Sequence, residues 1–207
     1  MEDFETLLAG AAEAHGHLCP GQVVGVRMAM LGCDLIGLDN PSVMPQIKKI
    51  IVYVEMDRCA ADALAHVTGV RLGRRSLKFI DNGIMAATFV NLETRRAFRI
   101  VSTETARDKA KELMPEITDS HRQQLEAYKI MDTDDLFDVS EVRVDIPASD
   151  MPGPTRFKAV CTRCGIVIRD KKEVFMNNEI LCRPCAYGSY FQPVKGSTHA
   201  EKRHHTL

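Results

Sequence analysis

Four cysteines near the C-terminal end have the type and spacing of metal ligands. Cys161 and Cys164 form one Cys-x2-Cys pair, and Cys182 and Cys185 form a second pair after a gap of seventeen residues. Two intervening residues let both thiolates of a pair turn toward one point, and the longer gap lets the chain bring the pairs together. The spacing therefore predicts a tetrahedral four-sulfur cage suited to Zn²⁺. The alternatives are two disulfides or four unrelated buried thiols.

The residues beside these cysteines predict a small zinc-binding fold. Gly165 can adopt the positive φ that follows the second thiolate of a zinc knuckle, and Pro184 suits the first turn of a helix. A knuckle, a hairpin and a helix in this order make a treble clef, which we expect over residues 156–195. A four-sulfur cage leaves no open coordination position, so its predicted role is structural.

A second group of metal-binding residue types lies near the N-terminus. The stretch His15-Gly-His17-Leu-Cys19 places two imidazoles and a thiol within five residues, before a predicted helix start. Residues two apart in an extended loop point the same way, so His17 and Cys19 can share a metal ion. The glycine at position 21 lets the backbone approach a ligand closely.

Cys59 and Asp62 extend this group from a different part of the chain. Like Cys19, Cys59 lies at a predicted helix start, where the helix dipole favours a thiolate. We predict a metal-binding or catalytic role for the group, with Cys59, Cys19 and His17 ranked ahead of Asp62 and His15. The alternative is that His15 ends a helix, His17 lies on the surface, and both cysteines are small buried hydrophobic residues.

The elements that must position these residues can be predicted from apolar spacing and glycine. An amphipathic helix should end at His15-Gly16, a second should run from Pro20 to Gly37, and a third should be capped by Asp57 and run through Val67. The run 50–55 is rich in β-branched residues and predicts a buried strand. Further predictions are a tight Asn82-Gly83 hairpin between strands 77–80 and 85–90, a strand 97–101 that continues the meander, helices 103–114 and 120–131, and an edge strand 139–146.

Composition and charge indicate a globular protein with two parts. The chain has 207 residues, 45% hydrophobic and 27% charged, with no apolar run as long as a membrane span. The net charge is −7 over residues 1–155 and +6 over residues 156–207. We expect an α+β core domain over 1–150 with N-terminal helices and an antiparallel-rich sheet, the zinc finger over 156–195, and a polar, mobile tail over 196–207. The N-terminus lacks a secretory signal, and seven cysteines suit a reducing compartment, so we expect a cytoplasmic protein.

Other features carry weaker signals. The loop 69–76 holds three arginines and two glycines, and is either an anion-binding loop or a solvated turn. Cys33 lies within an apolar helix pattern and is expected in the core. Asp81 either faces the site or makes an Asx turn. The remaining histidines have no partner that sequence can name: His66, His121, His199, His204 and His205.

Taken together, four stretches resemble the FmdE (FwdE) family, which takes its name from formylmethanofuran dehydrogenase. They are His15 to Gly21, Val54 to Ala63, Thr68 to Gly73, and Asp81 to Asn91. The resemblance implies an α+β core that is usually dimeric, with a metal-binding cleft formed by the His/Cys loop and the cysteine of the later helix.

On this resemblance, His17, Cys19 and Cys59 are the expected ligands of a second metal, Zn²⁺ or another transition metal, with Asp62 as a neighbour. Some members of the family also carry a C-terminal treble clef similar to the fingers of regulators related to TraR and DksA. The chain departs from the family pattern at Arg74-Arg75, where a lysine is expected, so a role that requires lysine is not carried over.

Three functions follow from these residues. The first is a metal-binding accessory protein of C1 (methanogenesis-type) or molybdopterin metabolism, or of metal delivery, with a homodimeric core and a protein partner in that system. The second is a zinc-finger regulatory protein whose basic C-terminal module binds nucleic acid or the transcription machinery. The third is a stand-alone metal-dependent enzyme in which Cys59 or Asp62 is catalytic. The chain is too short and has too few cysteines to be the molybdenum or tungsten catalytic chain itself, and no membrane partner is expected.

Overall fold

The computed structural model describes residues 1–192 and residue 194. The described chain forms two compact units: residues 1–147 with 151–153, and residues 148–150 with those from 154 onward. The predicted tail over 196–207 lies outside the described residues. No helix in the described part of the chain has the length and apolar character needed to cross a membrane.

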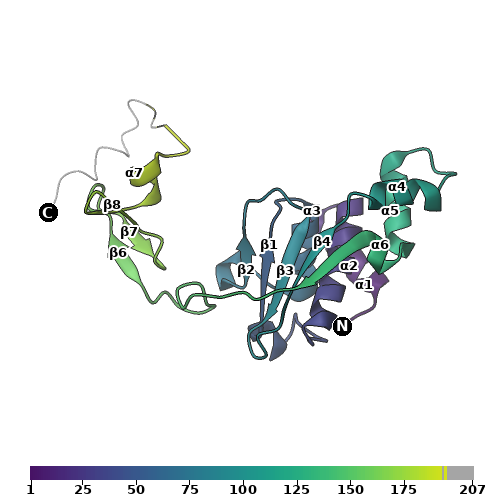
Figure 1. Cartoon of the computed structure of the whole chain (residues 1–207), viewed down its shortest axis with the longest axis horizontal. Coiled ribbons are helices and arrows are strands. Elements are labelled where there is room, and N and C mark those ends of the chain that lie inside the picture. The colour runs from purple at the N-terminus through teal and green to yellow at the C-terminus, as the bar shows by residue number, and fades with distance from the viewer. Residues whose placement is uncertain (193, 195–207) are drawn as a thin grey trace. The chain divides into compact units, whose positions relative to one another are not determined.

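Helices in the first unit cover one face of a five-stranded sheet (Figure 1). The helices are α1 (Phe4–His15), α2 (Pro20–Leu35), α3 (Cys59–Thr68), α4 (Ala106–Leu113), α5 (Ser120–Ile130) and α6 (Thr133–Leu136), with short 3-10 turns at Gln46–Lys48 and Leu72–Arg74. The strands are β1 (Ile50–Val54), β2 (Leu77–Phe79), β3 (Ala86–Asn91), β4 (Ala97–Ser102) and β5 (Phe137–Glu141), in the order β2-β1-β3-β4-β5. The predicted α+β class with a mostly antiparallel sheet is confirmed.

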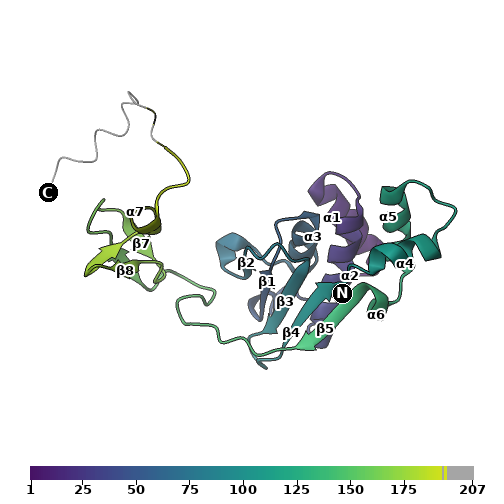
Figure 2. The same cartoon turned by 45° about the horizontal axis from the view of Figure 1, so that its top comes forward.

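Helix α2 is the central helix of this layer because glycines remove side chains from its packed face. A Cβ atom on Gly25 would lie 2.7 Å from the carbonyl oxygen of Ala60 in α3, and one on Gly32 would lie 2.3 Å from the ring of Phe89 in β3. The backbone of α2 therefore contacts α3 and the sheet directly. Figure 2 shows α1, α2 and α3 together on this face. This packing brings the N-terminal ends of α2 and α3 together.

The predicted Asn-Gly hairpin is wrong. Strand β2 pairs in parallel with β1, whereas β3 pairs with the other edge of β1 in antiparallel. Residues between β2 and β3 pass around the end of β1: the Ile80 amide donates to the Val54 carbonyl at 2.9 Å, and the Ile84 amide donates to the Glu55 carbonyl at 3.0 Å. An Asn-Gly pair favours a local turn, but it does not determine which strands pair across that turn.

Two boundaries also differ from the predictions. The N-cap of α3 is Arg58, not Asp57, and its side chain makes no capping hydrogen bond. Asp57 is exposed and pairs loosely with Arg58 at 4.0 Å, so Cys59 becomes the first residue of the helix. The last strand begins at Phe137 and ends at Glu141, because pairing with β4 stops where the partner strand begins at Ala97.

A buried ion pair fixes the end of β1 that leads to Cys59. The Glu55 carboxylate accepts hydrogen bonds from Arg99 Nε at 2.6 Å, Arg99 Nη2 at 2.9 Å and Asn82 Nδ2 at 2.8 Å. The hydrogen bond from Arg99 lowers the pKa of Glu55, and it outweighs burial, which acts in the opposite direction. The pair ties β1, β4 and the connection before β3 to one another.

We expect Glu55→Gln to lower the free energy of unfolding by about 3 kcal/mol at neutral pH, because it leaves the Arg99 guanidinium without its counter-charge. The folded-state pKa of Glu55 is depressed, so its stabilisation is present above the unfolded pKa and is lost as pH falls through the folded one. The variant should lack this acid-dependent component in urea unfolding curves.

The matched control for this prediction is Glu93→Gln, which removes an exposed carboxylate paired with Lys49. Its expected cost is below about 1 kcal/mol, as for other surface ion pairs. Equal losses in the two variants would show that the Glu55 pair contributes no more than a surface pair.

Candidate metal centres

The second unit brings its four cysteines together from two hairpins and a short helix. Its elements are β6 (Lys158–Val160), β7 (Val167–Arg169), β8 (Val174–Met176), β9 (Glu179–Leu181) and α7 (Arg183–Tyr187). Cys161 and Cys164 lie in the turn between β6 and β7, Cys182 follows β9, and Cys185 lies in α7. Gly165 has a φ of 73°, as the knuckle requires, and its amide donates to the Cys161 carbonyl at 2.9 Å.

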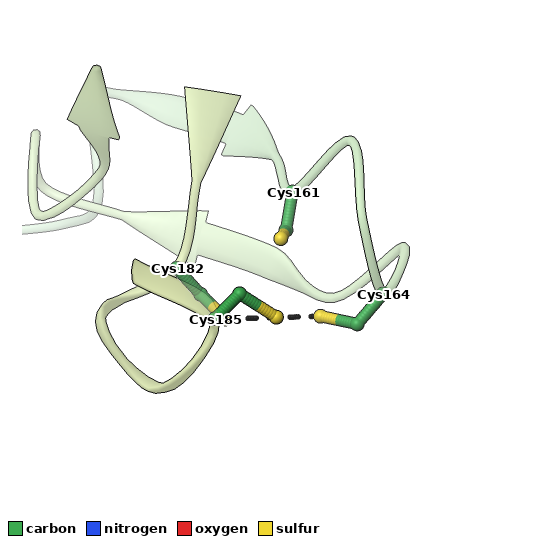
Figure 3. A group of neighbouring side chains, drawn as sticks. All are labelled: Cys161, Cys164, Cys182 and Cys185. Carbon is green, nitrogen blue, oxygen red and sulfur yellow. Dashed lines mark hydrogen bonds between the residues drawn. The ribbon is translucent and has the colours of Figure 1, made fainter. Parts of the chain in front are cut away.

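The four sulfur atoms have the separations of a zinc cage. All lie within 4.8 Å of one another, and the Sγ atoms of Cys164 and Cys182 are 3.7 Å apart (Figure 3). Tetrahedral zinc with Zn–S bonds of about 2.3 Å would place its sulfurs about 3.8 Å apart. A disulfide requires about 2.05 Å, and all seven cysteines are free. The four thiols are thus positioned to hold one metal ion.

The electrostatics of the cluster also favour a cation. Burial opposes ionisation of Cys161, but backbone amides of Cys182, Cys164 and Arg163 outweigh it and lower its pKa to about 6. Contact with Cys182, together with burial, raises the pKa of Cys185 to about 12. One thiolate is stabilised by the backbone, whereas further thiolates beside it need a positive charge between them.

The first unit gathers His15, His17 and Cys19, each contributing one donor atom within 4.8 Å of the others. Helix α1 ends at His15 because Gly16 adopts a left-handed φ of 96°. This reversal brings the imidazole rings of His15 and His17 to a centroid distance of 4.7 Å. Cys19 is buried and extended at the N-cap of α2. A tight turn between two helices therefore builds a three-donor group.

His15 is oriented as a metal ligand by Asp62. Its Nδ1 lies 2.8 Å from Asp62 Oδ2, while its Nε2 is buried without a hydrogen-bond partner among the described residues. A proton on Nδ1 donated to the carboxylate leaves a lone pair on Nε2, as in the carboxylate–histidine–metal arrangement. Asp62 thus acts through His15 rather than as a ligand. The residues present fit a metal ion, because an orphaned buried nitrogen lies beside a second imidazole and a thiol.

Cys59 lies against Cys19 but is not one of the three grouped donors. It is the first residue of α3, and burial, followed by a hydrogen bond with Cys19, raises its pKa. A Cβ atom on Gly21 would lie 3.0 Å from Cys59 Cβ and 3.7 Å from Cys19 Sγ. The space left by Gly21 is therefore occupied by these two cysteines rather than by an approaching ligand.

Sequence reasoning missed Gln22 as a member of this site. Its side chain is fully buried, and its Nε2 donates to the carbonyl of Cys59 at 2.6 Å. Its Oε1 is buried with no partner in the described part of the chain. A buried unpaired amide oxygen is costly unless a bound group donates to it. The signal in the sequence was a glutamine directly before the apolar stretch Val23-Val24 of α2.

The other candidate residues lie apart from this group. Cys33 is fully buried in the helix core, where burial raises its pKa to about 12. His66 packs against the position of Gly10 in α1. In the loop 69–76 the Arg71 and Arg74 side chains are exposed, and Asp81 is also exposed. His199, His204 and His205 lie outside the described residues.

Comparisons with known proteins agree with this fold and with the position of the motifs. The family described as "FmdE, Molybdenum formylmethanofuran dehydrogenase operon" matches residues 14–138. A "Probable S-adenosyl-L-methionine-binding protein" from Archaeoglobus fulgidus is 33% identical over 102 residues, which are 49% of this chain and 28% of that protein. The chain thus spans little more than a quarter of the length of this relative.

A solved structure is similar in fold over most of the chain. The crystal structure of a tungsten formylmethanofuran dehydrogenase FmdE-like protein from Syntrophus aciditrophicus has a TM-score of 0.58 and 16% identity. The match covers 92% of this chain and 96% of that chain. At this identity the similarity concerns the fold.

Proposed function

Because the chain belongs to the FmdE family, we propose that it is a metal-binding accessory protein with a transition-metal ion in its core. The observation that carries the proposal is the unpartnered, buried Nε2 of His15, which Asp62 orients beside His17 and Cys19. In this proposal His15, His17 and Cys19 hold the ion, Cys59 is the fourth donor or its neighbour, and the C-terminal cysteines hold a structural Zn²⁺.

The donor set favours Zn²⁺ or another borderline-soft transition metal over Mg²⁺ or Ca²⁺, which prefer oxygen ligands. A metal bound by three protein donors supplies Lewis-acid chemistry or a position for transfer to a partner. The protein residues hold this site ready: Asp62 keeps a proton on His15 Nδ1, and Gln22 fixes the start of α3 and offers an acceptor oxygen.

The family and the fold support a cellular role within C1 or molybdopterin metabolism. We propose that the protein acts as a homodimer in the cytoplasm and delivers metal or supports a molybdoenzyme partner. A reducing compartment suits its free cysteines, because the proposed ligands must remain thiolates.

The proposal predicts two metal ions per chain by elemental analysis of protein purified under reducing conditions. Cys19→Ser and His15→Gln should each lower the count to about one, because they remove core donors and leave the four-cysteine cage intact. Asp62→Asn should weaken core metal binding by roughly 10- to 100-fold, as expected when the partner of a ligating histidine is changed.

Cys33→Ala is the matched control for this experiment, because Cys33 is buried in the core away from both groups. It should keep two metals per chain. If Cys19→Ser and His15→Gln also keep the wild-type count, the core site does not exist and the proposal fails.

A second candidate function is supported by the surface of the C-terminal unit. The net charge over residues 156–207 is +6, and aromatic side chains in this unit are exposed: Phe175, Tyr187, Tyr190 and Phe191. Cations and exposed aromatic rings together suit single-stranded nucleic acid. Binding to an oligonucleotide should then weaken steeply with salt and be lost on removal of residues 156–207. Absence of binding at low salt would exclude this candidate.

A further inference from the structure

We propose that Cys19 and Cys59 are a redox-active pair, which a peroxide converts into a disulfide that joins the starts of α2 and α3. The metal-related part of this inference rests on the proposed function. The disulfide itself does not, because it requires only the two thiols.

The first support is the close contact between the two helices. Gln22 holds the Cys59 carbonyl at 2.6 Å, and one turn further along α2 a Cβ on Gly25 would lie 2.8 Å from the Ala60 Cα. The backbones of α2 and α3 are therefore in contact next to Cys59. A disulfide needs two Cα atoms within about 4.4–6.8 Å, a separation that helices with side chains between them do not reach.

The second support is that both thiols lie against one spot on α2. The Cβ position of Gly21 is 3.7 Å from Cys19 Sγ and 3.0 Å from Cys59 Cβ, and the two thiols share a hydrogen bond that acts on the pKa of Cys59. Any residue larger than glycine at position 21 would separate them. Cys59 is also partly exposed, which gives an oxidant access, whereas Cys33 is fully buried.

The reaction balances with a peroxide as the oxidant. One cysteine attacks the peroxide as the thiolate, its sulfur is oxidised to a sulfenic acid, and hydroxide or an alkoxide leaves and takes up a proton. The second thiol attacks this sulfur, the S–S bond forms, and water leaves. Two thiols lose two electrons and two protons, and the peroxide is reduced to two molecules of water, or to one of water and one of alcohol.

The disulfide would change the core metal centre in a specific way. A disulfide sulfur is a poor ligand, since the thiolate is the form that binds metals, so oxidation removes Cys19 from the His15, His17 and Cys19 group. Two imidazoles remain, which is too few for tight binding. The core site is thus expected to release its metal under oxidation and to recover it after reduction.

The test uses the full chain with its metals, treated with hydrogen peroxide in a dose series and then alkylated. Mass spectrometry should show a loss of about 2 Da and a disulfide-linked peptide pair containing Cys19 and Cys59. A chromogenic zinc or cobalt chelator should record release of one metal ion per chain at this stage. A thiol reductant should reverse both changes.

The variants provide the controls. Cys33→Ala should behave as the wild type, whereas Cys59→Ala should lose the linked peptide pair and form stable sulfenic acid or more oxidised products on Cys19. Gly21→Ala should lower the rate of disulfide formation at least about tenfold if close approach matters. A second measurement on the metal-free protein keeps the test independent of metal binding.

The outcomes separate this inference from the proposed function. If the linked pair forms but the protein never holds a core metal, the proposed function fails and the redox pair stands. If a core metal binds but peroxide produces only separately oxidised cysteines, or links Cys33 or the C-terminal cysteines instead, the redox pair is wrong and the metal site stands.

Discussion

Cys164→Ser should leave the C-terminal unit unfolded while the first unit keeps its structure. The buried core of this unit consists of Cys161, Ile168, Leu181 and Cys182, so half of its members are metal ligands. A core this small cannot offset the entropy of ordering its hairpins. Binding of a structural Zn²⁺ contributes about 10–16 kcal/mol in comparable small modules, and loss of one thiolate removes most of it.

Two-dimensional amide NMR spectra would measure this effect. Resonances from residues 156–192 should collapse into the range of an unfolded chain, and the spectrum of the first unit should be unchanged. A strong chelator added to the wild type should give the same result, and Cys33→Ala should not. A variant that retains dispersed C-terminal resonances would show that the hairpins fold without a complete cage.

Gly25→Ala is expected to destabilise the first unit by about 3 kcal/mol or more, the upper range for overpacking a core. The new methyl group would lie 2.7 Å from both the Ala60 carbonyl oxygen and the Ala63 Cβ. These are a backbone atom and a fully buried side-chain atom, so neither can rotate away. Helices α2 and α3 must separate, which also moves Cys59 away from Cys19.

Urea unfolding at neutral pH and metal content together test this prediction. Gly73→Ala is the matched control, because no atom of the described residues lies within 4 Å of a Cβ at that position; its expected change is within about 0.5 kcal/mol. The Gly25→Ala protein should also bind its core metal more weakly than the control. Equal stability of the two variants would mean that α2 and α3 do not depend on this close contact.

The features that sequence could predict are those set by neighbours along the chain. Apolar spacing with Gly16 and Gly37 located the first two helices, and the cysteine spacing located the C-terminal cluster. The strand order was not predictable in this way, since β1 pairs with two strands that come later and the Asn82-Gly83 signal is local. Pairing energies between distant segments decide such an order.

The candidate metal centre divides along the same line. The turn from His15 to Cys19 is local, and its residue types and spacing identified it as a site. Asp62 was only a neighbour by sequence, because its contact with His15 depends on how α3 packs beside α1. Gln22 escaped notice because a buried glutamine is recognised by the carbonyl that it contacts, which lies 37 residues further along the chain.

The pairing of β1 with two later strands also sets an order of events during synthesis. All residues of the core group, from His15 to Asp62, are made before β2 and β3, which flank β1 on both edges. At about 5–20 residues per second, the nascent chain carries Cys19 and Cys59 for a few seconds before the sheet that supports them can form. During that interval the thiols are unprotected by structure or metal, so the redox state of the compartment where translation occurs decides whether the site is completed intact.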